Sequence, residues 1–279
     1  MPYTAEISRA NPSCFLFLID QSGSMADPFG AGEPSRRKAD GVADAINRLL
    51  QNLVIKCAKE EGVRDYYHVG VIGYGAHVGP AFSGSLAGRE LVPISEIGNM
   101  PARVEERTKK VDDGAGGLVD QLVRFPIWFD PVANGGTPMC QALGRAQTIL
   151  QGWLAQHPAC FPPIVINITD GEATDGDPSG AADAIRKLSS NDGEVLLFNV
   201  HLSSPRATPI EFPDTEAGLP DQFAQLLFRM SSPLPAYMRS IAQQEGYKVS
   251  EGTRGFVFNA DIVAVIRFLD IGTRPSDLR

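Results

Sequence analysis

The sequence contains little cysteine or histidine, and neither is grouped. Its four cysteines, Cys14, Cys57, Cys140 and Cys160, are widely spaced in a chain of 279 residues and include no C-x-x-C pair. We therefore expect four reduced thiols rather than a disulfide framework, which favours a cytoplasmic protein. The four histidines are scattered and form no H-E-x-x-H motif, so zinc-dependent hydrolysis has no support.

Long apolar segments are absent as well. No stretch approaches the roughly 20 apolar residues that are needed to span a bilayer. The short apolar run 14–19 ends at Asp20 and lacks the features of a secretory signal. The chain carries 25 Lys and Arg against 33 Asp and Glu, a formal net charge of −8. Because this charge repels phosphate groups, we expect neither nucleic acid nor a membrane as a partner.

What the sequence does contain is an alternation of short apolar runs with amphipathic segments. This order is typical of an α/β protein with a mostly parallel sheet and helices on both faces. The alternation continues to residue 269, so we expect one domain over residues 1–279, with a core at about 13–272. The expected strands are 14–19, 67–74, 163–168, 194–200 and 255–258, and the expected helices are 36–59, 139–155, 181–188, 223–230 and 261–269.

Two stretches do not follow the alternation. Residues 79–136 are rich in Gly and Pro, and we expect an edge strand or hairpin at 81–86 and 91–97, one helix and an extended connection. Residues 203–219 contain three prolines and indicate a surface excursion. Trp128 stands between two apolar residues, which favours burial under the connection, with an exposed docking patch as the alternative.

The clearest local motif is Asp20-x-Ser22-x-Ser24, directly after the first apolar run. Ligands of open parallel sheets bind beyond the carboxyl ends of the strands, where this motif is expected to lie. If the loop is roughly extended, alternate side chains point the same way and three oxygens converge. A polar turn after a strand is an equally good explanation of this segment alone.

Two distant segments make the pattern more specific. The run 163–168 leads to Asp170-Gly171, again an aspartate after a buried strand. Thr137 follows two glycines and precedes Pro138, which predicts Thr137 as a helix N-cap and Pro138 as the first helical residue. A cap is a sufficient structural reason for Thr137, but the joint pattern of all three segments indicates a shared site.

These residues resemble the metal-ion-dependent adhesion site (MIDAS) of the von Willebrand factor A (vWA) family in order and spacing. The resemblance implies a Rossmann-like α/β fold with a mostly parallel six-stranded sheet and one antiparallel edge strand. It implies metal-bound hydroxyls at Ser22, Ser24 and Thr137, with Asp20 and Asp170 bound directly or through water. The long stretches 79–136 and 203–219 depart from a minimal domain of this family and leave the partner undefined.

The chemistry of the five side chains agrees with a metal site. All five offer oxygen and none offers imidazole or thiolate, which favours Mg²⁺, or Mn²⁺ or Ca²⁺, over zinc. Because three of the five are neutral, the ion keeps an attraction for a carboxylate from outside. The expected function is therefore a non-enzymatic interaction module that binds an acidic residue of a partner protein.

The resemblance is closest to bacterial intracellular members of the family. Some of these are associated with protein kinases and phosphatases in tellurium-resistance-like stress clusters, and others with AAA+ ATPases. Two alternatives stay open. One is a metal-assisted phosphohydrolase, although the sequence offers no obvious nucleophile or general base besides the metal ligands. The other is a structural scaffold that has lost its metal.

One further acidic segment imitates a calcium loop. Asp175-Gly-Asp177-Pro-Ser179 matches the first half of an EF-hand, but the twelfth position is Arg186 instead of glutamate and Pro178 interrupts the loop. We interpret this segment as a turn followed by a helix.

Overall fold

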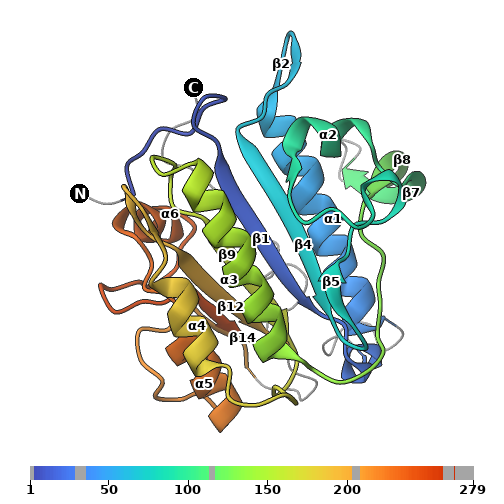
Figure 1. The fold of residues 1–279 in the computed structure, drawn as a ribbon. Helices are drawn as coiled ribbons and strands as arrows, with labels where there is room; N and C mark the ends of the chain where they lie inside the picture. Colours follow the sequence, from blue (N-terminus) through green and yellow to red (C-terminus); the bar gives the residue numbers. More distant parts are fainter. Residues whose placement is uncertain (1–2, 29–35, 113–116, 203–207, 260–266, 268–279) are drawn as a thin grey trace.

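The chain is built around a central sheet whose strands cross the middle of the molecule in Figure 1. A computed structural model describes residues 3–28, 36–112, 117–202, 208–259 and 267. Within these residues the sheet has eight strands in the order β13-β14-β12-β9-β1-β4-β5, and β6 also pairs with β4. Its five parallel strands are β1 (Ser13–Asp20), β4 (Tyr67–Tyr74), β9 (Ile164–Thr169), β12 (Leu196–His201) and β14 (Phe256–Phe258).

Short antiparallel strands extend the sheet at both edges. They are β5 (Val78–Pro80) and β6 (Val92–Pro93), which pair with β4, and β13 (Ile210–Glu211), which pairs with β14. The sheet is therefore mixed, and the expected arrangement of six mostly parallel strands with one antiparallel edge strand was wrong. The added strands are two or three residues long, too short to produce an alternating pattern in the sequence.

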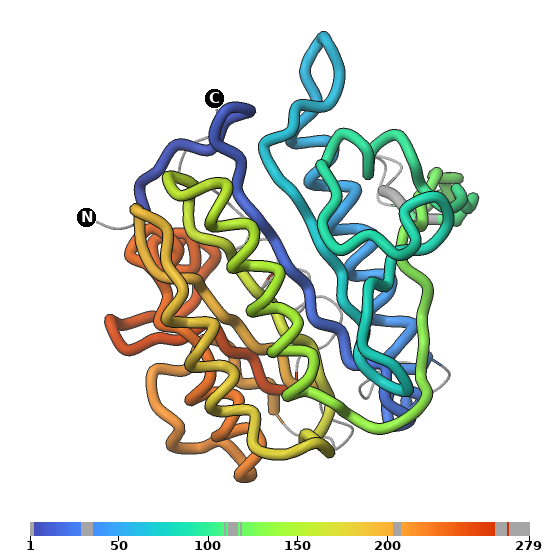
Figure 2. The backbone as a smooth tube through the Cα atoms, in the orientation of Figure 1, coloured from blue at the N-terminus to red at the C-terminus, as the bar shows by residue number. Residues whose placement is uncertain are grey.

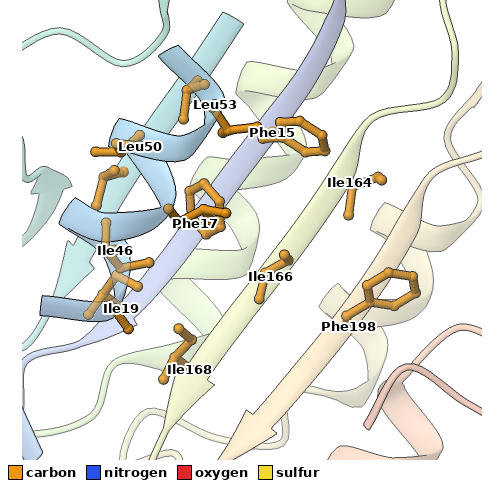
Figure 3. Close-up of a cluster of buried hydrophobic side chains, with 14 of the residues drawn as sticks. Phe15, Phe17, Ile19, Ile46, Leu50, Leu53, Ile164, Ile166, Ile168 and Phe198 are labelled. Carbon is orange, nitrogen blue, oxygen red and sulfur yellow. The ribbon is translucent and has the colours of Figure 1, made fainter. Parts of the chain in front are cut away.

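The parallel strands are apolar without interruption because both faces of the sheet are covered. Every residue of β1 is buried, and its side chains alternate between two cores. Phe15, Phe17 and Ile19 contribute to one cluster, and Cys14, Leu16 and Leu18 to the other. Figure 3 shows Phe15 and Phe17 beside Ile46, Leu50 and Leu53 of α1.

The helices lie on the two faces of the sheet. Residues of α1 (Lys38–Cys57), α2 (Ile94–Asn99) and α6 (Ala236–Gln244) contribute to the first core, and those of α3 (Met139–Gln156), α4 (Ser179–Arg186) and α5 (Gln222–Met230) to the second. Among the described residues no helix is both long and apolar enough to cross a membrane.

Helix α6 was not predicted, because only Met238 and Ala242 are fully buried in it. The predicted helix at 261–269 falls, apart from residue 267, outside the described residues.

The stretch 79–136 contains a long hairpin where none was predicted. Strands β7 (Arg103–Asp112) and β8 (Leu118–Ile127) pair antiparallel apart from the main sheet. Of the edge strand or hairpin expected at 81–86 and 91–97, the structure contains a short edge strand, β6, which pairs with β4, and no hairpin of these two segments. The first segment contains a 3₁₀ turn (Gly84–Leu86), and the one helix expected in this stretch is α2. Arg107 of β7 holds the hairpin against α1, with its guanidinium 2.8 Å from the Asp44 carboxylate.

The apolar segment that follows the hairpin is buried. Trp128 is 2% exposed, and its indole Nε1 donates a hydrogen bond to the carbonyl oxygen of Ile97 at 2.6 Å. The amide of Asn47 on α1 bonds to the backbone of Trp128 and Phe129. These residues therefore fix the connection to the core and do not form an exposed docking patch.

Two smaller two-stranded sheets complete the described structure, β2 (Ala58–Lys59) with β3 (Gly62–Val63) and β10 (Ser189–Ser190) with β11 (Gly193–Glu194). All four cysteines are free, and Cys14, Cys57 and Cys160 are buried.

Candidate functional site

The carboxyl ends of the parallel strands bring the predicted residues to one edge of the sheet. Strand β1 ends at Asp20, and β9, its parallel neighbour, ends one residue before Asp170. The backbone trace in Figure 2 shows the end of β1, the start of α1 and the start of α3 at the same end of the molecule. The predicted position beyond the strand ends therefore agrees with the structure.

The loop after Asp20 is a tight turn rather than an extended segment. The carboxylate Oδ1 of Asp20 accepts a hydrogen bond from the backbone N–H of Ser22 at 2.8 Å, and a 3₁₀ helix follows at Gly23–Ala26. The turn brings the Ser22 and Ser24 hydroxyl oxygens within 2.9 Å of one another. The serines converge as predicted, but through this turn and not through the alternation of an extended strand.

Asp170 joins the cluster from the neighbouring strand. The Ser24 hydroxyl donates to Asp170 Oδ1 at 2.7 Å. The Thr169 hydroxyl donates to Asp20 Oδ2 at 2.7 Å and so connects β9 to the end of β1. Four of the five predicted residues, Asp20, Ser22, Ser24 and Asp170, are therefore linked in one hydrogen-bonded group.

Thr137 is placed beside this group by backbone contacts. The Gly23 N–H donates to the Gly135 carbonyl at 2.9 Å, and the Asn134 N–H donates to the Gln21 carbonyl at 2.6 Å. Gly135 has φ +92°, and a Cβ there would lie 2.3 Å from the backbone nitrogen of Ala76. Glycine is thus required at 135 for the close approach of this loop to the segment that follows β4. Thr137 itself is held by Thr174, because its backbone N–H donates to the Thr174 hydroxyl at 3.0 Å and its carbonyl accepts the Thr174 N–H at 2.9 Å.

The predicted capping role of Thr137 was wrong. Helix α3 begins at Met139, so the N-cap residue is Pro138 and not Thr137. The side chain of Pro138 makes no capping hydrogen bond. The cap comes from another loop, because the Asp175 carboxylate accepts the backbone N–H groups of Cys140 and Gln141 at 3.0 and 2.9 Å. Asp175 therefore acts as a remote cap, and the Thr137 hydroxyl is not needed for α3.

Asp20 is unusually buried for a carboxylate. Asp20 is 1% exposed, and this burial raises the pKa of its carboxyl to about 6. The hydrogen bonds from Thr169 and Ser22 lower the pKa, and the charge of Asp170 raises it by a smaller amount. A buried carboxylate without a cation is destabilising, whereas a bound cation would favour its charged form.

We expect the metal-free protein to lose stability as the pH rises through this pKa. Between about pH 4 and pH 6 the folded state holds a proton on Asp20 that the unfolded chain releases, so the free energy of unfolding falls as the pH increases. At pH 7 the Asp20→Asn variant should be more stable than wild type by about 2–3 kcal/mol.

Denaturation in chelator between pH 4 and pH 7 measures this difference. The gap between wild type and Asp20→Asn should close toward pH 4, and saturating Mg²⁺ should reverse it at pH 7. A gap that does not change with pH would show that Asp20 has an ordinary pKa.

The structure adds Lys38, a residue with no role predicted from the sequence. Lys38, the first residue of α1, has a side chain that is 3% exposed, and its Nζ lies 2.7 Å from Asp170 Oδ2. A signal was present in the sequence, because Lys38 is in helical register with the apolar residues Val42, Ala45 and Leu49. A lysine on the buried stripe of a helix requires a buried anionic partner.

A second unpredicted residue is His201 at the end of β12, in register with Thr169. Its ring Nδ1 is buried and has no hydrogen-bond partner among the described residues. Burial lowers the pKa of His201, Asp221 and Asp170 raise it, and Lys38 lowers it. The four histidines are scattered in the sequence, yet the fold places this one a strand away from Asp170.

The donor set fits a hard divalent cation. It combines two carboxylates with three hydroxyls, which is the oxygen chemistry that Mg²⁺ and Ca²⁺ prefer. Among the described residues there is no group of three or more His, Cys, Asp or Glu side chains that could hold a metal. A metal at this edge would therefore depend on the serine and threonine hydroxyls.

No protein-family model matches the sequence, and none of the curated proteins matches it. Similar solved structures include two of the type V pili tip protein Mfa5 from Porphyromonas gingivalis. Its three N-terminal domains are 19% identical over 58% of this chain and 20% of that one, with a TM-score of 0.29. Its vWF domain is 18% identical over 58% of this chain and 39% of that one, with a TM-score of 0.28.

The PilB minor pilin from Streptococcus sanguinis is 11% identical over 94% of this chain and 61% of that one, with a TM-score of 0.43. This chain spans less than two thirds of the length of each of these structures. Similarities of this size do not assign the chain to a family. The class that the structure itself defines is a mixed α/β fold with oxygen-bearing side chains gathered at the carboxyl edge of its sheet.

Proposed function

We propose that this chain is a vWA-type domain that binds one divalent cation through Asp20, Ser22, Ser24, Thr137 and Asp170. The observation that supports the proposal most is the hydrogen-bonded group of Asp20, both serines and Asp170, contributed by the ends of two neighbouring strands. The loop that contains Thr137 lies against the same turn. The two carboxylates of this group carry negative charge that a bound cation would neutralise.

The proposed ion is Mg²⁺, with Mn²⁺ and Ca²⁺ as alternatives. Mg²⁺ usually binds one or two protein carboxylates and completes its octahedron with oxygens from outside the protein. Two carboxylates and three neutral hydroxyls leave such a position open. The proposed outside ligand is a Glu or Asp of a partner protein, so the chain would be a non-enzymatic interaction module.

The setting of the module is also a proposal. Free, mostly buried thiols favour a reducing compartment, which supports a cytoplasmic location. The net charge of −8 favours a protein partner over nucleic acid or a membrane. A bacterial stress-response system, or one associated with kinases, phosphatases or AAA+ ATPases, would be the context of the partner.

Neither alternative function has equal support. A metal-assisted phosphohydrolase needs a nucleophile or general base near the metal, and Asp20, the carboxylate most perturbed here, is itself a proposed ligand. A metal-free scaffold has one observation in its favour, since Lys38 already supplies Asp170 with a positive charge.

Calorimetric titration with MgCl₂, MnCl₂ and CaCl₂ tests the proposal. We expect one site per chain, which Asp20→Ala removes because the carboxylate closest to the turn is lost. Glu172→Ala is a matched control, since Glu172 is exposed and two residues from Asp170, and it should bind like wild type. Absence of binding to all three ions, or equal binding by Asp20→Ala, would contradict the proposal.

A further inference from the structure

The Lys38 ammonium lies where it contacts one of the proposed metal ligands. Its Nζ is 2.7 Å from Asp170 Oδ2, while the Ser24 hydroxyl takes Asp170 Oδ1. Both side chains of the pair are almost inaccessible to solvent, at 3% for Lys38 and 0% for Asp170. Asp170 therefore already has a cation on one of its two oxygens.

A second carboxylate lies within reach of Lys38. Asp27 Oδ2 is 3.9 Å from Nζ, and the Asp27 side chain is 57% exposed. The backbone of Lys38 is fixed to the same residue, because its N–H donates to the Asp27 carbonyl at 2.9 Å. The four-carbon stem of lysine is flexible, so the ammonium can leave Asp170 while α1 stays in place.

Two cations cannot share Asp170 without a cost. A divalent ion bound to the serines and Asp170 would come close to the ammonium, and like charges at such a distance repel strongly in a buried place. A metal on Oδ1, beside Ser24, would also share the negative charge of this carboxylate with Lys38, which holds Oδ2 in a charge-assisted hydrogen bond. Lys38 and the metal are therefore alternatives at Asp170.

We propose that Lys38 is a tethered cation that competes with the divalent ion for Asp170, so that metal binding moves the ammonium toward Asp27 and solvent. This inference rests on the proposed metal site. In the metal-free protein the Lys38–Asp170 pair keeps the ligand in place and neutralised, and Lys38 sets the metal concentration at which the site fills.

The first test compares Mg²⁺ binding of wild type and Lys38→Met by calorimetry. Methionine keeps a similar length and apolar body but has no charge, so we expect Mg²⁺ to bind at least about tenfold more tightly. Lys59→Met, which removes an exposed lysine, should bind like wild type. Asp20→Ala in the Lys38→Met background should abolish the gain and so attribute it to the same site.

The outcomes separate this inference from the proposed function. Unchanged or weaker Mg²⁺ binding by a folded Lys38→Met variant would overturn the inference and leave the metal site standing. Absence of Mg²⁺ binding by wild type and by Lys38→Met would overturn both. Binding by Lys38→Met and not by wild type would support the inference, because the lysine would then hold the site closed, and would contradict the proposal that the wild-type chain itself binds the ion.

A second measurement uses wild type and does not depend on the folding of a variant. Acetylation by an amine-reactive reagent, followed by mass spectrometry, reports how accessible Lys38 is with and without saturating Mg²⁺. We expect Lys38 labelling to increase several-fold in Mg²⁺ and Lys59 labelling to stay constant. No increase for Lys38 at an Mg²⁺ concentration that saturates the calorimetric site would contradict the displacement.

Discussion

Replacing Asp170 with alanine is expected to destabilise the metal-free protein by at most about 3–5 kcal/mol, because the Lys38 ammonium loses its buried partner and has only the more distant, exposed Asp27 to turn to. The proposed ligands do not lie at an exposed rim, since Asp20, Ser22 and the Asp170 side chain are all buried. Denaturant unfolding in chelator measures the loss.

The double variant Lys38→Met/Asp170→Ala is the control for this mechanism. It removes both charges, so most of the stability should return, and the two single changes should be strongly non-additive. Glu172→Ala, which removes an exposed carboxylate nearby, should stay within about 0.5 kcal/mol of wild type. A double variant as unstable as Asp170→Ala would show that the ion pair is not the reason for the loss.

Ser22→Ala is expected to weaken binding of the partner protein strongly while the fold is preserved. The change removes one proposed metal ligand, whereas the backbone N–H of Ser22 still bonds to Asp20. Loss of a charged contact in a buried interface costs roughly 2–5 kcal/mol, which is a factor of about 30 to several thousand in affinity. Because Asp170→Ala also destabilises the fold, Ser22→Ala is the cleaner variant.

Affinity capture from the native host, followed by binding measurements with the purified partner, tests this prediction. Wild type in chelator should behave like Ser22→Ala in Mg²⁺, and Glu172→Ala in Mg²⁺ should behave like wild type. Changing the contacting Glu or Asp of the partner to the amide should have the same effect as Ser22→Ala. Capture that persists in excess chelator would mean that the metal is not the bridge. Leu122 on the hairpin, which is 70% exposed, would then be the next residue to test.

The strands that could be predicted are those that the fold buries on both faces. Strands β1, β4, β9, β12 and β14 appear in the sequence as apolar runs because helices cover both sides of the sheet. The edge strand β6 lies within the range 91–97 where an edge strand was expected. The edge strands β5 and β13 could not be predicted, since their pairing comes from the neighbouring strand and not from their own two or three residues.

The long hairpin was hidden by its charge. Strand β7 contains Glu105, Glu106 and Arg107 in succession, so no alternation of apolar and polar residues indicates a strand. Its structure depends on contacts that are distant in sequence, such as Arg107 with Asp44 and the Arg107 guanidinium 3.9 Å above the Phe125 ring. Such contacts between residues distant in sequence cannot be predicted from one sequence.

The site was predictable where its residues form a local pattern. The Asp-x-Ser-x-Ser motif and Asp170 each follow a buried strand, and parallel pairing brings them together. Thr137 was placed in the right loop but given the wrong local role, because the cap of α3 comes from Asp175. Lys38 was missed because its partner lies 132 residues away, and only the fold brings the two charges into contact.

The most direct test of the metal site is diffraction from crystals of the protein soaked in MnCl₂. We predict an anomalous peak within about 2.5 Å of the Ser22, Ser24 and Thr137 hydroxyl oxygens, with Asp20 and Asp170 bound directly or through water. The electron-density map of the same crystals should show the Lys38 ammonium moved away from Asp170. A map without a peak at the ends of β1 and β9, or with its strongest peak elsewhere, would contradict the account.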